Sequence, residues 1–304
     1  MRWIKAVEIG SSGVRTALVG DGQITDGQQN DTIKTPRALM EFVATGLPEA
    51  VTDIAYSVAG DIRHHSFVAL SPNQPWLSQT NLVTLTKQVL NRRSVVGNDM
   101  ETAALGMSEL FKDIPFFRVI TWSGGIGERV VKDWQVISDS EVGHILLDPG
   151  PFADPCGCGK RGCAEAIIGG VAAQAKVRAF TSHMGISIPA SYKWPTQFLD
   201  ACYEKHEPWA IDFYTRLIDG MARLLGILQT ALWVPTIIWK GGMARGILYE
   251  QNQAPSLLAT MQKYVVQPSW ADIRFQYGWK ANVVKDADSL LGCEKLSLQH
   301  FQDR

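Results

Sequence analysis

The fold is indicated near the N-terminus by the run Val7-Glu8-Ile9-Gly10-Ser11-Ser12-Gly13-Val14-Arg15-Thr16-Ala17-Leu18. This run predicts a strand, a turn of small residues and a second strand, and the following Gly20-Asp21-Gly22 suits another hairpin turn. The same order returns in the run Ile120-Thr121-Trp122-Ser123-Gly124-Gly125-Ile126-Gly127-Glu128-Arg129-Val130-Val131, before a turn at Lys132-Asp133 and a third short strand. The sequence therefore predicts two halves built on one plan.

The segments around these hairpins predict an α/β protein. Helices are expected at 37–46, 82–91, 100–111, 164–180 and 210–232, and further strands at 52–58, 94–97 and 236–239. A loop-rich stretch, 145–163, separates the second hairpin from the later helices. We expect a smaller N-terminal domain over 1–115 and a larger domain over 116–285. A C-terminal helix over about 286–304 is expected to pack back on the first domain.

Composition excludes several classes of protein. The 304 residues are 46% hydrophobic, so the chain can bury a core large enough for two domains. The 29 basic and 30 acidic side chains nearly cancel, which gives no long-range attraction to nucleic acid or to anionic membranes. No run reaches the ~18 apolar residues of a membrane-spanning helix, and Arg2 and Lys5 come too early for a signal peptide. A cytoplasmic protein is expected.

The most specific motif is Cys156-Gly157-Cys158-Gly159-Lys160-Arg161-Gly162-Cys163, with His144 twelve residues upstream. Three thiolates and one imidazole complete a tetrahedral zinc shell, and four protein ligands leave no position for a reacting water. A structural zinc ion is therefore predicted. A reduced cysteine-rich turn without metal is the simpler alternative, and a zinc ribbon for nucleic acid would need a second cysteine pair and a basic surface.

Acidic residues flank this motif at Glu141 and Glu165, and a third acid, Asp99, follows a short predicted strand. Carboxylates suit a sugar because each can accept hydrogen bonds from neighbouring hydroxyl groups. Asp99 lies where the strands of α/β sheets end, which is where reacting groups are usually placed. The alternative for Asp99 taken alone is the N-cap of the helix that follows it.

Together these residues resemble the ROK family (repressor, open reading frame, kinase), which has the two-domain actin-like ATPase and sugar-kinase fold with a cleft between the domains. The resemblance is carried by Tyr56-Ser57-Val58-Ala59-Gly60, Leu70-Ser71-Pro72-Asn73-Gln74-Pro75-Trp76, Gly97-Asn98-Asp99, Glu141-Val142-Gly143-His144 and the cysteine motif through Cys163-Ala164-Glu165. It implies a substrate site of Gly60, Asn98, Asp99, Glu141, His144 and Glu165, with Asp99 as the base and His144 also a ligand of zinc. It also implies a homodimer or homotetramer.

The phosphate side departs from the family's pattern. The family's Asp-x-Gly-Gly-Thr is replaced by Glu8-Ile9-Gly10-Ser11-Ser12, which keeps a carboxylate and a hydroxyl. In the second hairpin Gly124 stands where the family has a threonine, and Lys240 replaces the first glycine of a later turn. The nucleotide-binding residues that the resemblance implies are Glu8, Gly10, Ser11, Ser12, Gly124, Gly125, Gly241 and Gly242. For each hairpin alone, an ordinary glycine turn is the alternative.

The function implied by the resemblance is that of an ATP-dependent hexose kinase, similar to a glucokinase, acting with Mg²⁺ at the 6-hydroxyl. Family repressors carry a winged-helix segment ahead of the first hairpin, and here that hairpin begins at residue 3. A sugar-binding regulator without catalysis, a kinase with another phosphoryl donor and a zinc-dependent protein-binding module remain as alternatives. The segment 136–140 leads almost directly into Glu141, which predicts a rebuilt wall of the sugar pocket.

Overall fold

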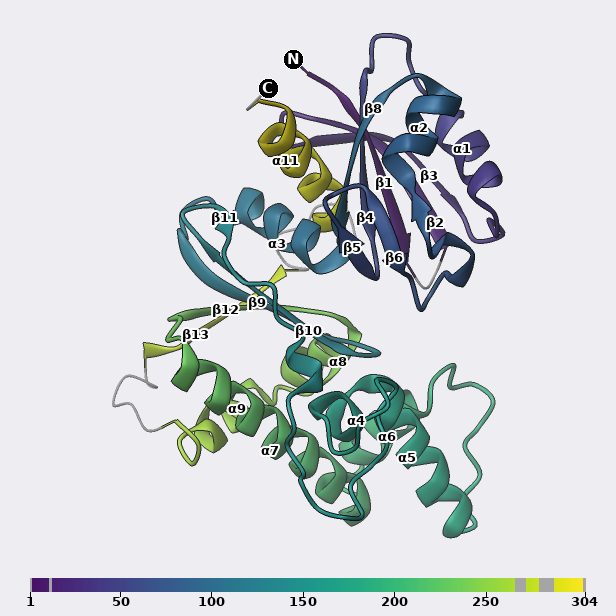
Figure 1. The fold of residues 1–304 in the computed structure, drawn as a ribbon. Coiled ribbons are helices and arrows are strands. Elements are labelled where there is room, and N and C mark those ends of the chain that lie inside the picture. The colour runs from purple at the N-terminus through teal and green to yellow at the C-terminus, as the bar shows by residue number, and fades with distance from the viewer. Residues whose placement is uncertain (1, 11–12, 266–271, 279–286, 303–304) are drawn as a thin grey trace. The chain divides into compact units, whose positions relative to one another are not determined.

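The computed structural model describes residues 2–10, 13–265, 272–278 and 287–302. The chain divides into two compact units (Figure 1). Unit 1 comprises Met1–Pro115, Arg129–Ser138 and Gly278–Arg304, and unit 2 comprises Phe116–Glu128 and Asp139–Tyr277. Both units combine strands with helices, so the predicted α/β class is confirmed.

Unit 1 contains a five-stranded sheet in the order β3-β2-β1-β4-β8. Its strands are β1 (Ile4–Gly10), β2 (Gly13–Gly20), β3 (Gln23–Asn30), β4 (Asp53–Val58) and β8 (Arg93–Asn98). The first three form the predicted hairpins, and β4 and β8 run parallel to β1. A smaller sheet holds β5 (Asp61–Arg63), β6 (Phe67–Leu70) and β7 (Thr80–Asn81), with a 3₁₀ turn η1 at Pro75–Leu77.

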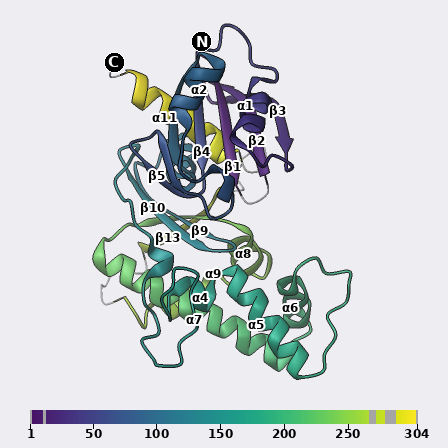
Figure 2. The same ribbon diagram turned by 45° about the vertical axis from the view of Figure 1, so that its right-hand side comes forward.

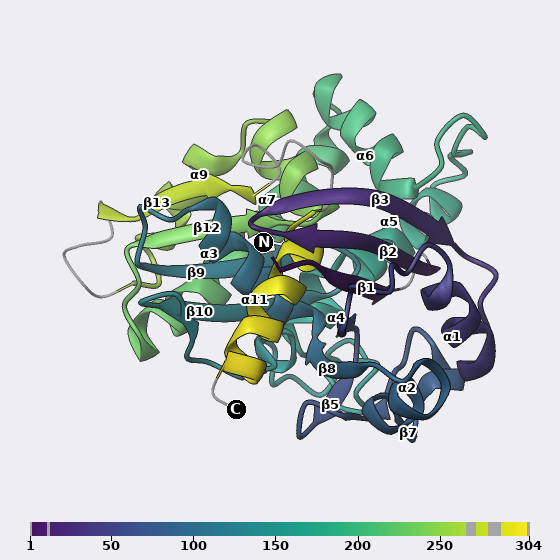
Figure 3. The same ribbon diagram turned by 90° about the horizontal axis from the view of Figure 1, so that it is seen from above.

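Helices cover both faces of the larger sheet because its side chains alternate between two apolar cores. One core joins Val7 and Ile9 of β1 to Leu39 and Met40 of α1 (Pro36–Ala44), with α2 (Leu82–Leu90) beside it. The other core joins Ile4 and Ala6 to α3 (Asp99–Leu110) and α11 (Asp288–Gln302). Figure 3 shows α11 on the opposite side of β1 from α1 and α2.

Two glycines let α3 and α11 pack with their backbones in contact. A Cβ atom at Gly106 of α3 would lie 1.8 Å from the Asp288 carbonyl oxygen, and one at Gly292 of α11 would lie 1.6 Å from that of Thr102. No side chain fits at either position without separating the helices. The C-terminal helix is thereby held against the helix that begins at Asp99.

The second sheet has the order β11-β10-β9-β12-β13. Its strands are β9 (Phe116–Trp122), β10 (Ile126–Lys132), β11 (Gln135–Val136), β12 (Thr236–Lys240) and β13 (Arg274–Tyr277). β12 lies between β9 and β13 and is parallel to both. The division between the units falls inside β10, after Glu128.

Unit 2 has a series of helices after its first strands, and Figure 2 shows α4 to α7 gathered together. Their bounds are η2 (Val142–His144), α4 (Ala164–Ile168), α5 (Gly170–His183), α6 (Pro195–Glu204), α7 (Pro208–Ala231), α8 (Gly242–Ala244), a π-helical turn η3 (Arg245–Glu250) and α9 (Ala254–Met261). Within the described part of the chain, no helix is both long and apolar enough to cross a membrane.

The prediction of one continuous helix over 164–180 is wrong, because the helix is interrupted at Gly169 and forms two separate helices, α4 and α5. Carbonyl groups at the end of α4 find partners other than the next helical turn. Lys176 Nζ donates to the carbonyl oxygens of Ala166 and Ile167 at 3.2 and 3.1 Å, and the indole of Trp122 donates to that of Ile168 at 2.7 Å. These bonds replace the helical ones, so the break leaves no buried carbonyl without a donor at those three residues.

Candidate metal centre and active site

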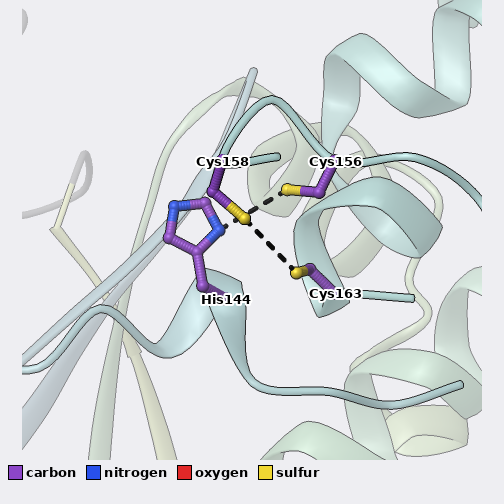
Figure 4. Close-up of side chains that lie close together, drawn as sticks. All are labelled: His144, Cys156, Cys158 and Cys163. Carbon is purple, nitrogen blue, oxygen red and sulfur yellow. Dashed lines mark hydrogen bonds between the residues drawn. The ribbon is translucent and has the colours of Figure 1, made fainter. Parts of the chain in front are cut away.

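The predicted metal ligands come together in unit 2. One ligand atom from each of His144, Cys156, Cys158 and Cys163 lies within 4.8 Å of the other three. The Cys158 and Cys163 sulfurs are 3.7 Å apart, and Cys156 Sγ is 3.5 Å from His144 Nδ1. Figure 4 shows the imidazole and the thiols turned toward one another. Tetrahedral zinc, with its usual bond lengths, places two sulfurs about 3.8 Å apart and a sulfur and a nitrogen about 3.6 Å apart. The donor set and its spacing fit zinc.

Backbone hydrogen bonds stabilise the metal loop, the segment 145–163 that carries the three cysteines. Cys156 N–H donates to the Lys160 carbonyl at 2.8 Å, and the N–H groups of Leu147 and Asp148 both donate to that of Gly162. Gly162 has a φ of 74°, and a Cβ there would lie 1.8 Å from the Asp148 carbonyl oxygen. Only glycine satisfies that backbone angle and that close approach.

The thiols of this cluster differ in acidity. A hydrogen bond from the Lys160 backbone lowers the pKa of Cys158, whereas burial raises the pKa of Cys163 to about 12. A metal ion binds thiolates, so binding at this cluster must release the Cys163 proton. Metal affinity at this cluster therefore rises with pH.

Glu165 connects the metal loop to the second glycine hairpin. It is the second residue of α4, two positions after Cys163, and its Oε2 accepts a hydrogen bond from the Ile126 backbone N–H at 3.1 Å. A Cβ at Gly125 would lie only 2.3 Å from the same oxygen. The Glu165 carboxylate thus packs against the hairpin turn, and the absence of a side chain at Gly125 leaves the space that it occupies.

Glu141 lies at the start of η2, the turn that also carries His144. Its carbonyl accepts a hydrogen bond from the His144 N–H at 3.0 Å, and the residue is exposed. His144 is therefore placed by the same short turn as Glu141. Glu165 also lies near this turn, because a Cβ at Gly143 of η2 would lie 3.4 Å from its Oε2.

The N-cap of α3 is Asn98, so the alternative that Asp99 caps this helix is wrong. Asn98 Oδ1 accepts hydrogen bonds from the N–H groups of Met100 at 2.9 Å and Glu101 at 3.4 Å. Glu101 Oε2 in turn accepts from the Asn98 N–H at 3.3 Å, which completes a capping box. Asp99 is the first residue of the helix, half-buried, and helix capping does not require its carboxylate.

The Asn98 side chain also forms hydrogen bonds with two other segments of unit 1. Its Nδ2 donates to the Gly60 carbonyl at 2.9 Å, and its Oδ1 accepts from Arg129 Nη2 at 3.2 Å. A Cβ at Gly60 would lie 2.1 Å from the Leu70 carbonyl oxygen, so this turn needs glycine. The structure brings Gly60, Asn98 and Asp99 together, and Asn98 holds them in place.

The first hairpin places Glu8 opposite Arg15 in the β1–β2 register, and the two side chains form an ion pair. A metal ion at Glu8 would share its carboxylate with that guanidinium. Gly10 ends β1, and among the described residues a Cβ there would meet nothing within 4 Å. The predicted nucleotide residues Ser11 and Ser12 lie outside the described residues.

The second hairpin and the later glycine turn adjoin each other in unit 2. Gly241 has a φ of 98°, and a Cβ there would lie 2.5 Å from the Trp122 carbonyl oxygen. By contrast, a Cβ at Gly124 would lie 3.5 Å from Val171, an ordinary contact, and one at Gly242 would meet no atom of the described part of the chain within 4 Å. Backbone amides in such turns can bind phosphate oxygens.

Sequence reasoning missed two buried polar residues of unit 1. Gln74, only 3% exposed, donates to the Gly10 carbonyl at 2.8 Å and accepts from the Trp76 indole at 2.7 Å. It therefore joins a predicted substrate-side segment to the first hairpin. Arg129, also 3% exposed, contacts Asn98. The signal for Arg129 was a charged Glu128-Arg129 pair inside an otherwise apolar strand.

The sequence matches a model of the ROK family over residues 4–299. An N-acetylmannosamine kinase of Shigella boydii is 35% identical over 179 residues, which cover 54% of this chain and 60% of that protein. The chain therefore matches about three fifths of the length of this curated relative.

Solved structures show the same fold. A ROK hexokinase from Thermus thermophilus aligns with a TM-score of 0.80 at 20% identity, over 99% of this chain and 100% of that one. A ROK family glucokinase from Streptomyces griseus, in complex with glucose and AMPPNP, aligns with a TM-score of 0.73 at 18% identity, over 98% and 99%. The predicted actin-like sugar-kinase fold is confirmed.

Proposed function

The chain belongs to the ROK family, and from that premise we propose that it transfers the γ-phosphoryl group of ATP to the primary hydroxyl of a hexose or an N-acylhexosamine. The observation that carries this proposal is the position of Asp99. It begins α3 at the carboxyl end of β8, and Asn98 rather than Asp99 caps the helix. A carboxylate at that place, not needed for the cap, suits a general base.

In the proposed reaction the Asp99 carboxylate accepts the proton of the sugar hydroxyl as its oxygen attacks the γ-phosphorus. The bond between that phosphorus and its bridging oxygen breaks, and ADP leaves. Asn98 keeps Asp99 in place, because its side chain is bonded to the helix N-terminus and to the Gly60 carbonyl. These bonds support a fixed geometry for the base, which proton transfer requires.

Glu141, His144 and Glu165 are proposed to bind the sugar hydroxyls from unit 2. Zinc held by His144 and the three cysteines would supply structure rather than chemistry, because four protein ligands leave it no open position. Its effect would pass to the sugar through the chain: Glu165 lies two residues after a ligand, and Glu141 three residues before another. The hydrogen bond from Ile126 to Glu165 supports a preset carboxylate.

The nucleotide is proposed to bind at the glycine turns, with Mg²⁺ entering with ATP. Backbone amides around Gly10, Gly124, Gly125, Gly241 and Gly242 would contact the phosphates. Glu8 is proposed to act on the magnesium ion through water, because its carboxylate is already paired with Arg15.

A sugar-binding regulator without catalysis is the second candidate. It is favoured by the Glu8–Arg15 ion pair and by Gly124, which offers no hydroxyl where the family has threonine. Both features weaken the phosphate side while leaving the sugar side intact.

The experiment is ADP release with Mg-ATP and a panel of sugars that begins with N-acetylmannosamine, N-acetylglucosamine, glucose and mannose. The relatives with 35% identity favour N-acetylmannosamine as the first sugar to test. Sugar-dependent ADP release supports the kinase. Thermal stabilisation by one sugar, with no ADP release from any of them, would instead establish the regulator.

A further inference from the structure

Arg129 is a buried charged side chain that takes no part in the proton transfer proposed for Asp99. It lies in β10, is 3% exposed, and follows Glu128, which is 2% exposed. Successive residues of a strand face opposite sides, and the two side chains have separate partners. Glu128 Oε1 accepts from Arg118 Nη1 at 2.9 Å, whereas Arg129 Nη2 donates to Asn98 Oδ1 at 3.2 Å. A buried guanidinium is costly unless specific partners compensate for its lost hydration.

The partner of Arg129 is the atom on which the start of α3 depends. Asn98 Oδ1 accepts from the guanidinium and from the first N–H groups of the helix. The arginine thus fixes the side chain that precedes the proposed base by one residue. Because a guanidinium stays protonated throughout the useful pH range, it also keeps a permanent positive charge at the residue next to Asp99.

Resting on the proposed function, we propose that Arg129 is a positioning residue for phosphoryl transfer. It holds the amide of Asn98, and through it Asp99, and its charge favours the ionised form of the base. The charge acts from the side chain that is hydrogen-bonded to the neighbour of Asp99, and a nearby opposite charge stabilises a carboxylate against protonation. The helix N-terminus acts in the same sense.

Other titratable groups lie at this end of α3. Glu101 belongs to the same helix, His65 of the β5–β6 turn has its Nδ1 4.0 Å from Glu101 Oε2, and the ring of His300 in α11 is 6.1 Å from that of His65. These groups are unchanged in every Arg129 variant. A difference between Arg129 variants therefore reports the guanidinium.

The test is the pH profile of kcat/KM for ADP release with N-acetylmannosamine, or with glucose if the panel shows that glucose is the substrate. Arg129→Gln should lower kcat about tenfold and move the acidic limb of the profile upward by about half to one pH unit. Arg129→Lys keeps the positive charge but lacks the planar guanidinium group. The acidic limb of its pH profile should therefore stay near that of wild type, while kcat remains reduced.

The control is Arg93→Gln, which makes the same change in net charge at the other end of β8. Arg93 is half-exposed at its side chain and lies five residues before Asn98, about 16 Å away along a strand. Screening by salt over that distance should leave the acidic limb where it is.

An active wild type whose Arg129→Gln variant keeps the wild-type limb would overturn this inference and leave the kinase proposal standing. If Arg129→Gln does not fold, Asn98→Ser takes its place. Serine still caps the helix but is too short to meet the guanidinium, so a smaller upward shift is expected and an unmoved limb contradicts the inference. A wild type that turns over no sugar removes the proposed function and this inference together.

Discussion

The glycines of the metal loop and of the glycine turns in unit 2 differ from one another in how much room they leave for a side chain. A Cβ at Gly162 of the metal loop would lie 1.8 Å from a backbone oxygen, and one at Gly125 would lie 2.3 Å from Glu165. Within the residues that the structure describes, the atom nearest to a Cβ at Gly124 would be 3.5 Å away, and at Gly242 there would be none within 4 Å. Tight and open positions therefore both occur on the proposed phosphate side, because Gly125 and Gly241 leave no room for a Cβ atom whereas Gly124 does. The departure at Gly124 occurs where the structure has room for a side chain.

The largest effect is expected from Asp99→Asn, which tests whether the protein is a kinase with Asp99 as its general base. Turnover should fall by about 10²–10⁴ because the amide cannot accept the hydroxyl proton. Stability should change little, since Asn98 keeps the cap. Steady-state ADP release and thermal unfolding check both expectations. ADP release within a few-fold of wild type would exclude Asp99 as the base.

A matched pair of glycine variants tests the contrast within one hairpin. Gly125→Ala should displace the Glu165 carboxylate, which is the flexible end of a side chain, so the protein should fold but bind sugar about 10- to 100-fold more weakly. Gly124→Ala adds the same methyl group in ordinary contact and should change sugar affinity less than about twofold. Calorimetric titration with sugar measures both variants, and equal affinities for the two would remove the contrast.

Glu8→Ala examines the first hairpin. Turnover should slow about tenfold, with a greater magnesium requirement, while sugar affinity without nucleotide stays unchanged. Glu8→Asp supplies the family's shorter carboxylate and serves as the control, which should retain turnover. The assignment of Glu8 to the nucleotide fails if Glu8→Ala loses sugar affinity and keeps its magnesium dependence.

The smallest effect is expected from Gly124→Thr, which restores the family's hydroxyl where the structure has room for a Cβ. One added hydrogen bond to a phosphate should lower the KM for ATP by about fivefold. Gly124→Val, which has nearly the same shape without the hydroxyl, is the control. A KM that responds equally to both substitutions would place the effect in packing.

The clustering of His144 and the three cysteines could be predicted because residue types and spacing are almost all that a zinc site requires, and the structure places all four together. The residue that caps α3 could not be predicted, because asparagine and aspartate are equally good N-caps. The sequence pattern does not show which of the adjacent residues Asn98 and Asp99 precedes the first helical turn. The break at Gly169 depends on Lys176 and Trp122, neither of which a local helical pattern reveals. Arg129 meets a partner 31 residues away, a pairing that only the fold creates.

Removal of the metal tests the central claim most directly, namely that the Cys₃His loop fixes the sugar side and leaves the phosphate side independent. The protein would be titrated calorimetrically with N-acetylmannosamine, or with the sugar that the panel selects, and separately with a non-hydrolysable ATP analogue. Each titration would be run before and after chelation, with circular dichroism to verify the fold. One zinc per chain is expected, with sugar affinity falling at least about tenfold on its loss and returning with added zinc, and nucleotide affinity unchanged within about twofold. Protein purified without chelators that holds no zinc, or sugar affinity that survives its removal, would contradict the account.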